Sequence, residues 1–551
     1  MSNATISGLS GKRILVTAYD LEQSEHRGIA VFSKALIRCL HDAGAEVWLL
    51  TGFSPIASPS GKGMKLLPKR TSQLIQTSVL LESLAKGQQI TKIGHLERRF
   101  GFIRKFITWR NRFLLAISML QRPRTYRKTD TKKISLKKLF DNPYLRMERL
   151  SYLHHLEGIV TAPGIFMACQ TAAMLNEQKP VRLDVSDFDV LLTSCPLNLS
   201  PLPGPILVQT IHDLIPLEYF AHNEDQLMFT HRLQACIPAR RLYVSEATAQ
   251  KFHERILKTE SKGQASENRC IEPIERVIVQ LPSLIFPDHL LANPGNVGDF
   301  EPGSYLLRPD PDELDPKEPD PKEPEDWQYD QEIFKKSFIK WQKALKKWVE
   351  RPINRRARRM RPFRYVLFNS SVEARKNLFL MAEAYAQSGL SSQGIHLCVT
   401  GKLKNDDYSN AVKEIVRQEP GILLTGYVDE ATKLDLYLNA LALLSPSLVE
   451  GFGIPVLDAA CLGLPAVASD SESHLEIANL HDFSHYLLTL SPLKSRDWAD
   501  AMAAIAGLGS ELWNPKQASA ERKRRIQRYE HYSEVFMNRL QKDLEETLGQ
   551  E

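Results

Sequence analysis

The sequence has few cysteines, and none of them has the paired spacing typical of metal sites or disulfide frameworks. The seven cysteines are scattered through 551 residues, mostly within apolar stretches. Residues 1–12 lack a basic segment followed by an apolar core, so the sequence predicts no secretory signal. No apolar run reaches the roughly 18 residues of a transmembrane helix, and residues 160–175, interrupted by Pro163 and Gln170, predict a buried helix instead. These absences predict a cytoplasmic protein whose cysteines are reduced and packed in its cores.

The composition indicates a chain that can bury two hydrophobic cores. It has 43% hydrophobic and 25% charged residues over 551 positions, which is long enough for two domains. Strand patterns alternate with helical patterns in each half, and this predicts the α/β class with doubly wound parallel sheets. The net charge of +6 is modest for the length. Since no nucleic-acid-binding module is recognisable either, we expect no nucleic acid partner.

The same patterns divide the chain into consecutive regions. Residues 1–292 are predicted to form an N-terminal Rossmann-like domain with a basic insertion at about 92–150. Residues 293–363 are predicted to be a charged, proline-rich linker insertion followed by a basic helix. Residues 364–510 are predicted to form a second Rossmann-like domain, and residues 511–551 a helical tail that packs back on the first.

The first insertion is basic and aromatic. From Lys92 to Arg149 it carries seventeen Lys or Arg against four Asp or Glu, with Phe and Trp residues interleaved. One hypothesis is an amphipathic helix at about 98–122 that lies on an anionic membrane surface. A solvated helical insertion is the alternative, and the sequence leaves both open.

The second insertion contains a tandem repeat, Asp-Pro-Lys-Glu-Pro, at 315–319 and 320–324. It is too proline-rich and polar to fold alone. A segment with thirteen cations follows at 335–364, whose charges could pair with the acids of the insertion or whose Trp341 and Trp348 could join a membrane face. We expect no catalytic residues in this linker.

One stretch near the end of the second domain has the pattern of a binding site. An apolar strand at 442–444 leads into a turn with Glu450, Pro455 then suits a first helical turn, and Asp458 lies one turn further on. Open α/β sheets bind ligands at such a carboxyl edge, beside a helix N-terminus. The turn itself consists of Gly451, Phe452 and Gly453. Its glycines allow hydroxyl groups to approach the backbone closely.

A pair of cations occupies the start of the second domain. Residues 364–377 predict a strand and then a short loop with Arg375 and Lys376, and a helix is predicted from Leu378 to about Gln387. A guanidinium and an ammonium group at a helix entrance can neutralise a diphosphate. An ordinary solvated Arg-Lys pair is the alternative.

The N-terminal half supplies further candidates. A buried strand at 13–18 precedes a helix that ends at Gly44, with Gly28 at the start of that helix. A second strand at 206–211 delivers His212 and Asp213. We expect His212 to contact a ligand and Asp213 to cap its own loop, because Asp readily bonds local backbone.

These segments resemble the retaining glycosyltransferases of glycosyltransferase family 4. Glu450 and Asp458 resemble the E-x7-E signature of that family, with Asp in place of the second Glu, and Arg375 and Lys376 resemble its Arg-Lys-Asn element. His212 resembles the histidine of its His-Asp loop. The resemblance covers about two thirds of the chain and is absent across both insertions.

The resemblance implies the GT-B fold, with two facing Rossmann-like domains and a cleft between them. It implies transfer of a hexose from a nucleoside diphosphate sugar to a hydroxyl of a glycan or lipid-linked acceptor, without a metal ion. The family's roles, carried over by position, are as follows. Arg375 and Lys376 are expected to hold the diphosphate, and Asp458 the ribose. Glu450 and the backbone amides of Gly451, Phe452 and Gly453 are expected to orient the sugar, which His212 also approaches. Gly28 is expected to let the backbone come close to the donor. The resemblance to mannosyltransferases favours GDP-mannose slightly over UDP-sugars.

Two other function classes stay open at this point. A sugar-nucleotide epimerase of GT-B type would use a similar cleft without an acceptor. A catalytically silent glycosyltransferase-like scaffold would bind membrane or a partner through the basic insertions. Asp458, Ser370 and Ala30, where the family has Glu, Gly and Gly, leave the scaffold hypothesis open.

Overall fold

The computed structural model shows two compact α/β units. It describes residues 8–23, 28–55, 69–90, 101–119, 123–136, 148–175, 180–219, 224–258, 274–287, 361–401, 406–419, 421–426 and 428–549. Unit 1 comprises Met1–Ser283, Val449–Ile454 and His531–Glu551, and unit 2 comprises Leu284–Leu448 and Pro455–Glu530. The linker repeat and the basic helix predicted after it lie almost wholly outside the described residues.

Unit 1 is built on an eight-stranded sheet of order β11-β10-β9-β7-β1-β2-β5-β4. Its strands are β1 (Arg13–Thr17), β2 (Glu46–Thr51), β4 (Lys132–Ser135), β5 (Gly158–Thr161), β7 (Val190–Thr193), β9 (Ile206–Ile211), β10 (Arg240–Tyr243) and β11 (Glu275–Val277). All neighbours pair in parallel except β4 with β5. A small parallel sheet, β3 (Thr125–Tyr126), β6 (Val181–Leu183) and β8 (Leu199–Pro201), lies in the same unit. Strands buried on both faces give the apolar runs seen in the sequence.

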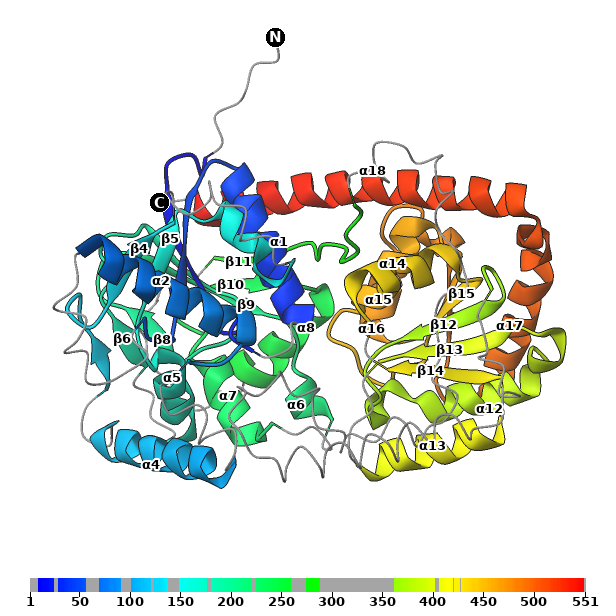
Figure 1. Ribbon diagram of the computed structural model, residues 1–551, viewed down its shortest axis with the longest axis horizontal. Coiled ribbons are helices and arrows are strands. Elements are labelled where there is room, and N and C mark those ends of the chain that lie inside the picture. Colours follow the sequence, from blue (N-terminus) through cyan, green and yellow to red (C-terminus); the bar gives the residue numbers. More distant parts are fainter. Residues whose placement is uncertain are drawn as a thin grey trace, which may run out of the picture. The chain divides into compact units, whose positions relative to one another are not determined.

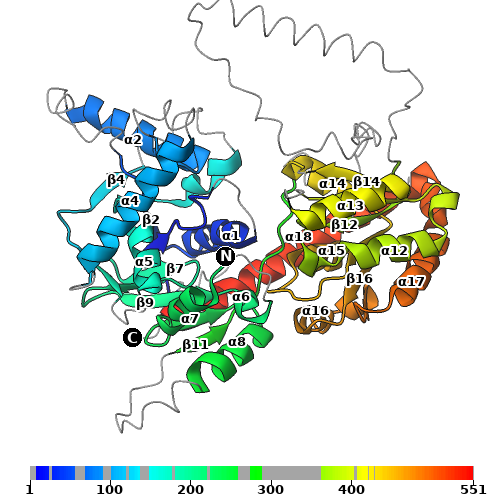
Figure 2. The same cartoon turned by 90° about the horizontal axis from the view of Figure 1, so that it is seen from below.

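Helices flank both faces of this sheet (Figures 1 and 2). They are α1 (Gly28–Asp42), α2 (Lys69–Lys86), α4 (Gly101–Met119), η3 (Glu148–His155), α5 (Ile165–Met174), α6 (Ile215–Glu218), α7 (Gln226–Gln234), α8 (Glu246–Phe252) and η4 (His253–Leu257). Ser245 caps α8 by accepting a hydrogen bond from the backbone N-H of Thr248 at 3.0 Å, a role that serine commonly has at helix N-termini.

Unit 2 has a fully parallel six-stranded sheet of order β14-β13-β12-β15-β16-β17. Its strands are β12 (Tyr365–Asn369), β13 (His396–Thr400), β14 (Ile422–Gly426), β15 (Ala442–Ser445), β16 (Ala466–Ser469) and β17 (Leu487–Leu490). The sequence-predicted α/β class, with two Rossmann-like parallel-sheet domains as in the GT-B fold, is confirmed.

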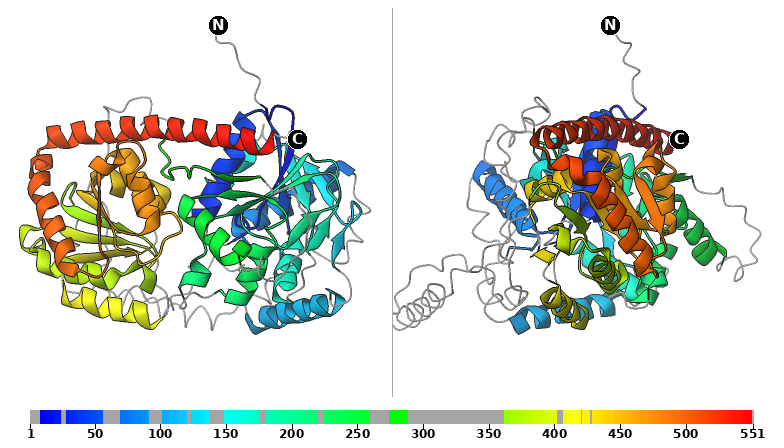
Figure 3. Two further views of the ribbon diagram at one scale, coloured as in Figure 1. Left: turned by 180° about the vertical axis from the view of Figure 1, so that it is seen from behind. Right: turned by 90° about the vertical axis from the view of Figure 1, so that its right-hand side faces the viewer.

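The helices of unit 2 surround its sheet (Figure 2). They are η6 (Ala374–Lys376), α12 (Leu378–Ser388), η7 (Ser391–Gln393), α13 (Asp407–Gln418), α14 (Glu430–Asn439), α15 (Ile454–Leu462), α16 (Glu472–Ala478), η8 (Phe483–His485), α17 (Ser495–Leu508) and η9 (Gly509–Trp513). The last helix, α18 (Pro515–Leu548), is one continuous helix of 34 residues (Figure 3). Its residues up to Glu530 belong to unit 2 and those from His531 to unit 1.

Polar contacts hold the end of α18 within unit 1. The Lys12 ammonium donates to the carbonyl oxygen of Leu548 at 2.9 Å, and the Arg276 guanidinium pairs with Asp543 at 3.1 Å. The Leu548 carbonyl belongs to the last turn of a helix, where carbonyls lack intrahelical partners, so a lysine is a favourable neighbour there.

The prediction of one buried helix over residues 160–175 is wrong. The segment is the end of β5 followed by α5. Pro163 lacks a backbone N-H, and Gly164 takes the left-handed conformation with φ 75° directly before the helix, so the chain turns there. Among the described residues, six cysteines are buried and unpaired, and none of the described helices is both long and apolar enough to cross a membrane.

Candidate functional site

The two predicted site segments, with Arg375 and with Glu450, follow neighbouring strands of unit 2. β12 and β15 pair in parallel through Val366 with Ala442 and Leu367 with Leu443, so the loops after them leave the same edge of the sheet. The backbone N-H of Leu448 donates to the carbonyl oxygen of Arg375 at 2.8 Å. This bond ties the cation loop to the segment that leads, two residues later, to Glu450.

Both predicted cations are held close to the protein body. The Arg375 side chain is 17% exposed and pairs with Glu373 at 3.0 Å, and Lys376 is 7% exposed. The next residue, Asn377, takes the left-handed conformation with φ 56°, which Asn tolerates better than most residues. Its amide donates to the Pro492 carbonyl at 2.9 Å. The turn between η6 and α12 is therefore fixed.

The turn after Glu450 depends on its glycines. Gly453 has φ 97°, a conformation that side chains strongly disfavour. A Cβ on Gly451 would lie 2.9 Å from the Cβ and 3.0 Å from the Oδ2 of Asp213. Phe452 between them is 7% exposed. Val449–Ile454 is counted with unit 1, so the structure brings the glycine turn and the His-Asp loop together.

His212 follows β9 and is fixed on three sides. Its Nε2 donates to the carbonyl oxygen of Ser194 at 2.8 Å, its ring lies edge-on to Phe32 at 4.9 Å between centroids, and its backbone oxygen accepts a bond from the Thr248 hydroxyl at 3.2 Å. Burial lowers the pKa of His212 to about 4. The ring is therefore neutral near pH 7, with Nδ1 as an acceptor.

Asp213 has the local role predicted for it. Its Oδ1 accepts a hydrogen bond from the backbone N-H of Ile215 at 3.1 Å, which is an Asx turn. Gly28 begins α1 and is exposed, and a Cβ there would meet only Ile454, at 3.5 Å. Gly28 thus lies beside the same loop, but with room for a side chain.

A buried polar network beneath His212 did not stand out in the sequence. The Ser194 hydroxyl donates to Asp20 at 2.5 Å, and the Ser194 N-H donates to the Thr17 hydroxyl at 3.2 Å. Asp20 is 8% exposed, and burial raises its pKa to about 6. An acid three residues after a buried strand was the signal that could have found it. Through Ser194 the network holds the carbonyl that sets the His212 tautomer.

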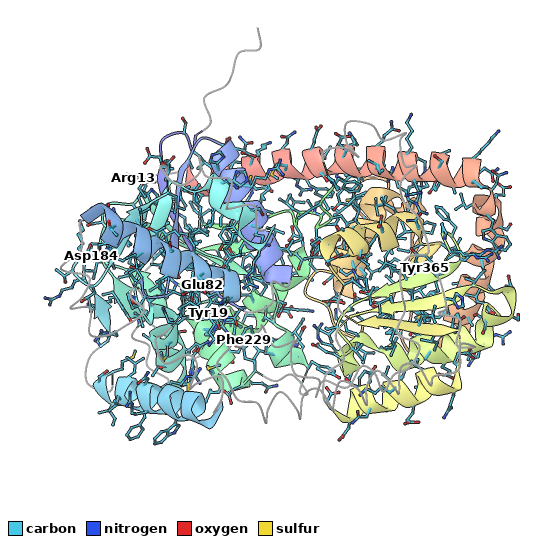
Figure 4. The ribbon with its side chains drawn as sticks, in the orientation of Figure 1. Arg13, Tyr19, Glu82, Asp184, Phe229 and Tyr365 are labelled. Carbon is cyan, nitrogen blue, oxygen red and sulfur yellow. The ribbon has the colours of Figure 1, made fainter. Side chains whose placement is uncertain are left out.

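A buried arginine provides positive charge beside this network. The Arg232 guanidinium lies 5.9 Å from the ring centroid of Tyr19 and 5.7 Å from that of Phe229, both labelled in Figure 4. Its Nε donates to the carbonyl oxygen of Pro196 at 2.9 Å, and it pairs with Glu224. Arg232 lowers the pKa of Asp20, but burial has the larger, raising effect.

Glu22 is a second acid at this edge of unit 1 that the sequence did not reveal. Its Oε1 accepts bonds from the Thr51 hydroxyl at 2.5 Å and from the Gly52 N-H at 2.7 Å. Burial raises its pKa to about 7. Perturbed acids at the carboxyl ends of strands are common in binding sites.

Asp458, the predicted ribose ligand, lies inside unit 2. Its side chain is 1% exposed, and its Oδ1 accepts a hydrogen bond from the Tyr529 hydroxyl at 3.0 Å. That hydroxyl accepts in turn from the backbone N-H of Leu284 at 2.6 Å. Tyr529 belongs to α18 and was not predicted, because only folding brings residues 458 and 529 together.

An open hollow of ≈ 670 Å³ borders the cation loop. Asn377, Leu448 and Pro492 form one side of it, and α12 and α13 form the others. Its lining includes the acids Glu383 and Glu419 and no Lys or Arg. Because it offers no positive charge, it does not suit a diphosphate.

Comparison with known proteins concerns mainly unit 2. Residues 351–512 match the family model described as glycosyl transferases group 1. This part of the chain is therefore similar to group 1 glycosyl transferases. A curated relative, O-antigen chain mannosyltransferase B of Escherichia coli, is 30% identical over 115 residues, which are 20% of this chain and 30% of that protein. The match therefore spans less than a third of the relative's length.

Solved structures with overall likeness are more distant. Sucrose-phosphate synthase from Thermosynechococcus elongatus has 12% identity and a TM-score of 0.46, covering 96% of each chain. HepE of Anabaena, in complex with UDP and glucose, has 12% identity and a TM-score of 0.45, covering 98% of this chain and 99% of that one. Because both scores are below 0.5, the fold assignment depends on the sheet topology described above.

Proposed function

We propose that this protein is a retaining glycosyltransferase that transfers a hexose from a nucleoside diphosphate sugar to a hydroxyl of a glycan or lipid-linked acceptor. The observation that carries the proposal is the Arg375 and Lys376 loop, hydrogen-bonded at Leu448 to the segment that leads to Glu450. It supports a donor site in which two cations and an acid come from adjacent strand ends. The group 1 match over residues 351–512 favours the same activity.

In this proposal the diphosphate binds the two cations. Arg375 and Lys376 neutralise the negative charge that grows on the diphosphate as its bond to the anomeric carbon breaks. The acceptor oxygen forms its bond on the same face of the sugar, and the proton of the acceptor hydroxyl leaves with the diphosphate. The residues of the chain contribute positioning and electrostatics, without a covalent intermediate. We expect no metal ion to be required.

The sugar is oriented by residues from the loops already described. Glu450 accepts hydrogen bonds from sugar hydroxyls, and the amides of Gly451 and Gly453 donate to them. His212 accepts one through Nδ1, the nitrogen that its Ser194 bond leaves available for that role. Asp458 is proposed to hold the ribose, although one of its oxygens is already bonded to Tyr529.

Mannose, carried by GDP, is the proposed hexose. It is supported by the resemblance of the His212 loop and the Arg-Lys-Asn element to mannosyltransferases, and by the partial match to a protein named as a mannosyltransferase. We also propose peripheral association with an anionic membrane, which suits a lipid-linked acceptor.

The test is donor turnover without acceptor. GDP-, UDP-, ADP- and dTDP-sugars are incubated with the wild type and with Glu450→Ala, and release of nucleoside diphosphate is measured. We expect slow release from one donor, lost in the variant. Isomerisation of the sugar without release would show an epimerase, whereas no release and no stabilisation of the fold by any nucleotide would show a silent scaffold.

A further inference from the structure

Helix α4 of unit 1 exposes a cluster of large apolar side chains. Trp109 is 59% exposed, Phe113 52%, Leu114 57% and Ile117 51%. The rings of Trp109 and Phe113 stack at 5.5 Å with an interplanar angle of 11°. Together with Arg110 these residues are called the α4 outer face. A cluster of this size on one helix is unusual for a surface that only meets water.

The opposite side of α4 holds the helix to the protein. Met119 is 3% exposed, and Met119 and Leu115 pack in the core formed by β5 and α5. Arg112 donates to Gln170 of α5 at 3.3 Å. At about 100° per residue, Trp109, Phe113 and Ile117 lie along the side of α4 away from these contacts. Figures 1 and 3 show α4 at the outside of unit 1, beyond α5.

The charge around this face is positive. Arg110 is exposed and falls between Ile117 and Leu114 around the helix. Within α4, residues 101–119, the sequence has four Lys or Arg and no Asp or Glu. An apolar face that carries Arg110, on a helix whose sequence has no acids, is complementary to anionic lipid headgroups over acyl chains. A neutral glycan suits this face less well than an anionic lipid, because a neutral glycan has no negative charge to pair with Arg110.

The type of side chain favours a lipid surface as well. Trp and Phe are residues that lie at the boundary between headgroups and acyl chains. No described helix is suited to cross a membrane, so the expected mode is a helix lying in the plane of the surface. A single apolar anchor binds a membrane only weakly, and a basic group beside it makes the binding stronger.

We propose that the α4 outer face is the surface by which this protein docks on anionic lipid bilayers. Trp109 and Phe113 insert at the level of the headgroup boundary, and Arg110 contacts lipid phosphates. This identifies the residues behind the membrane association proposed above. It does not depend on glycosyl transfer, because docking is measured without any donor.

The first experiment measures binding of the full chain to vesicles. Flotation is compared for neutral phosphatidylcholine vesicles and vesicles with added phosphatidylglycerol. We expect binding to the anionic vesicles, a loss of about tenfold or more for Trp109→Ser with Phe113→Ser, and about fivefold for Arg110→Gln. Leu227→Ser is the matched control, since Leu227 of α7 is also 62% exposed in unit 1. Melting temperatures check that each variant is folded.

The second experiment reports where the tryptophan lies. Brominated acyl chains quench tryptophan fluorescence at the depth of the bromine. We expect quenching in the wild type that falls in Trp109→Phe, while the aromatic replacement keeps most of the binding. Quenching that is equal in both proteins would overturn the proposal.

Other occupants of the face give different results. If the face binds a second copy of the chain, light scattering will show a dimer without lipid that the double serine variant abolishes, and vesicle binding will not depend on it. If the face is covered by another segment of the chain, the double variant will lower the melting temperature and leave vesicle binding unchanged. Either result would overturn membrane docking. Because acceptor-free donor turnover needs no lipid, its loss separately tests the transferase proposal.

Discussion

The two units place polar groups at the carboxyl ends of their parallel strands in different ways. After two adjacent strands of unit 2 the candidate residues are grouped in two short segments, residues 375–376 and 450–458, of which residues 450–454 are counted with unit 1. In unit 1 Asp20, Ser194 and His212 come from the ends of three strands and are connected only through hydrogen bonds. A site made of contiguous segments leaves a motif in the sequence, whereas a dispersed network does not.

The electrostatics of the two units differ as well. Unit 2 contributes cations to its strand ends, which suits an anionic diphosphate. Unit 1 contributes a neutral His212 and acids, Asp20 and Glu22, whose pKa values burial raises. Its buried cation Arg232 is already paired with Glu224. The histidine and the two acids suit hydroxyls as ligands better than phosphates. The strand ends of the two units therefore favour different chemical groups of a ligand.

The largest effect is expected from the cation loop. Lys376→Ala should lower turnover about 10²-fold or more, because charge on the departing diphosphate is no longer neutralised. Steady-state donor hydrolysis and transfer assays measure it. Lys376→Met keeps the apolar stem of the side chain and so separates the loss of charge from the loss of packing. The control is Lys433→Ala, because Lys433 of α14 is also a lysine of low exposure, at 16%, and is paired with Glu430. Turnover within a few-fold of the wild type would remove the diphosphate role.

A second prediction compares two glycines beside the same loop. Gly451→Ala should lower turnover strongly, since its Cβ would lie 2.9 Å from Asp213 and force the loop to move. Gly28→Ala should fold normally, because its Cβ meets Ile454 at an ordinary 3.5 Å. Turnover and melting temperature are measured for both. A folded Gly28→Ala with weakened donor binding would indicate that a ligand approaches the backbone there, and an active Gly451→Ala would contradict the close packing.

The buried network of unit 1 should make stability depend on pH. The folded pKa of Asp20, about 6, is above its ordinary value of 3.8, so the folded chain keeps this proton to higher pH than the unfolded chain. The wild type therefore loses stability as pH rises from about 4 to about 6. The stability of Asp20→Asn relative to the wild type should rise by about 3 kcal/mol over that window. Urea unfolding at several pH values measures it.

Asp187 offers a control of opposite sign. Hydrogen bonds from Lys128 and Lys133 lower its pKa to about 2, so its contribution is present above its ordinary pKa of 3.8 and is lost as pH falls towards 2. Asp187→Asn should therefore lower stability at neutral pH, though only weakly because the group is exposed, and its difference from the wild type should disappear as pH falls from about 4 towards 2. The same pH dependence in both variants would contradict the assignment to Asp20.

A further prediction concerns Asp458 and Tyr529. Tyr529→Phe removes a hydroxyl that joins Asp458 to the backbone of Leu284 and should lower the free energy of unfolding by about 1–2 kcal/mol. If Asp458 also holds the ribose, Asp458→Asn will weaken donor binding in calorimetry and Tyr529→Phe will not. Unchanged donor affinity in Asp458→Asn would make the acid structural.

Much of the fold could be predicted from local pattern. The strand at 206–211 has the bounds of β9, and the helix predicted from Leu378 begins there as α12, because apolar periodicity and turn residues act within a few positions. The segment 160–175 was mistaken, since an apolar run does not distinguish a strand followed by a helix from a single helix. The candidate residues themselves were found by type and spacing, and their ligands stay predictions.

By itself the sequence determined the two parallel-sheet domains, the glycine turn after Glu450 and the cation pair before α12. Each of these depends on neighbours within a few residues, where φ preferences, capping and apolar spacing act. Only the tertiary structure decided that Tyr529 bonds Asp458, that Asp213 crowds Gly451, that Ser194 sets the His212 tautomer and that the α4 outer face is exposed. These depend on which distant segments pack together, and that follows from burial of the whole core, which no local pattern encodes.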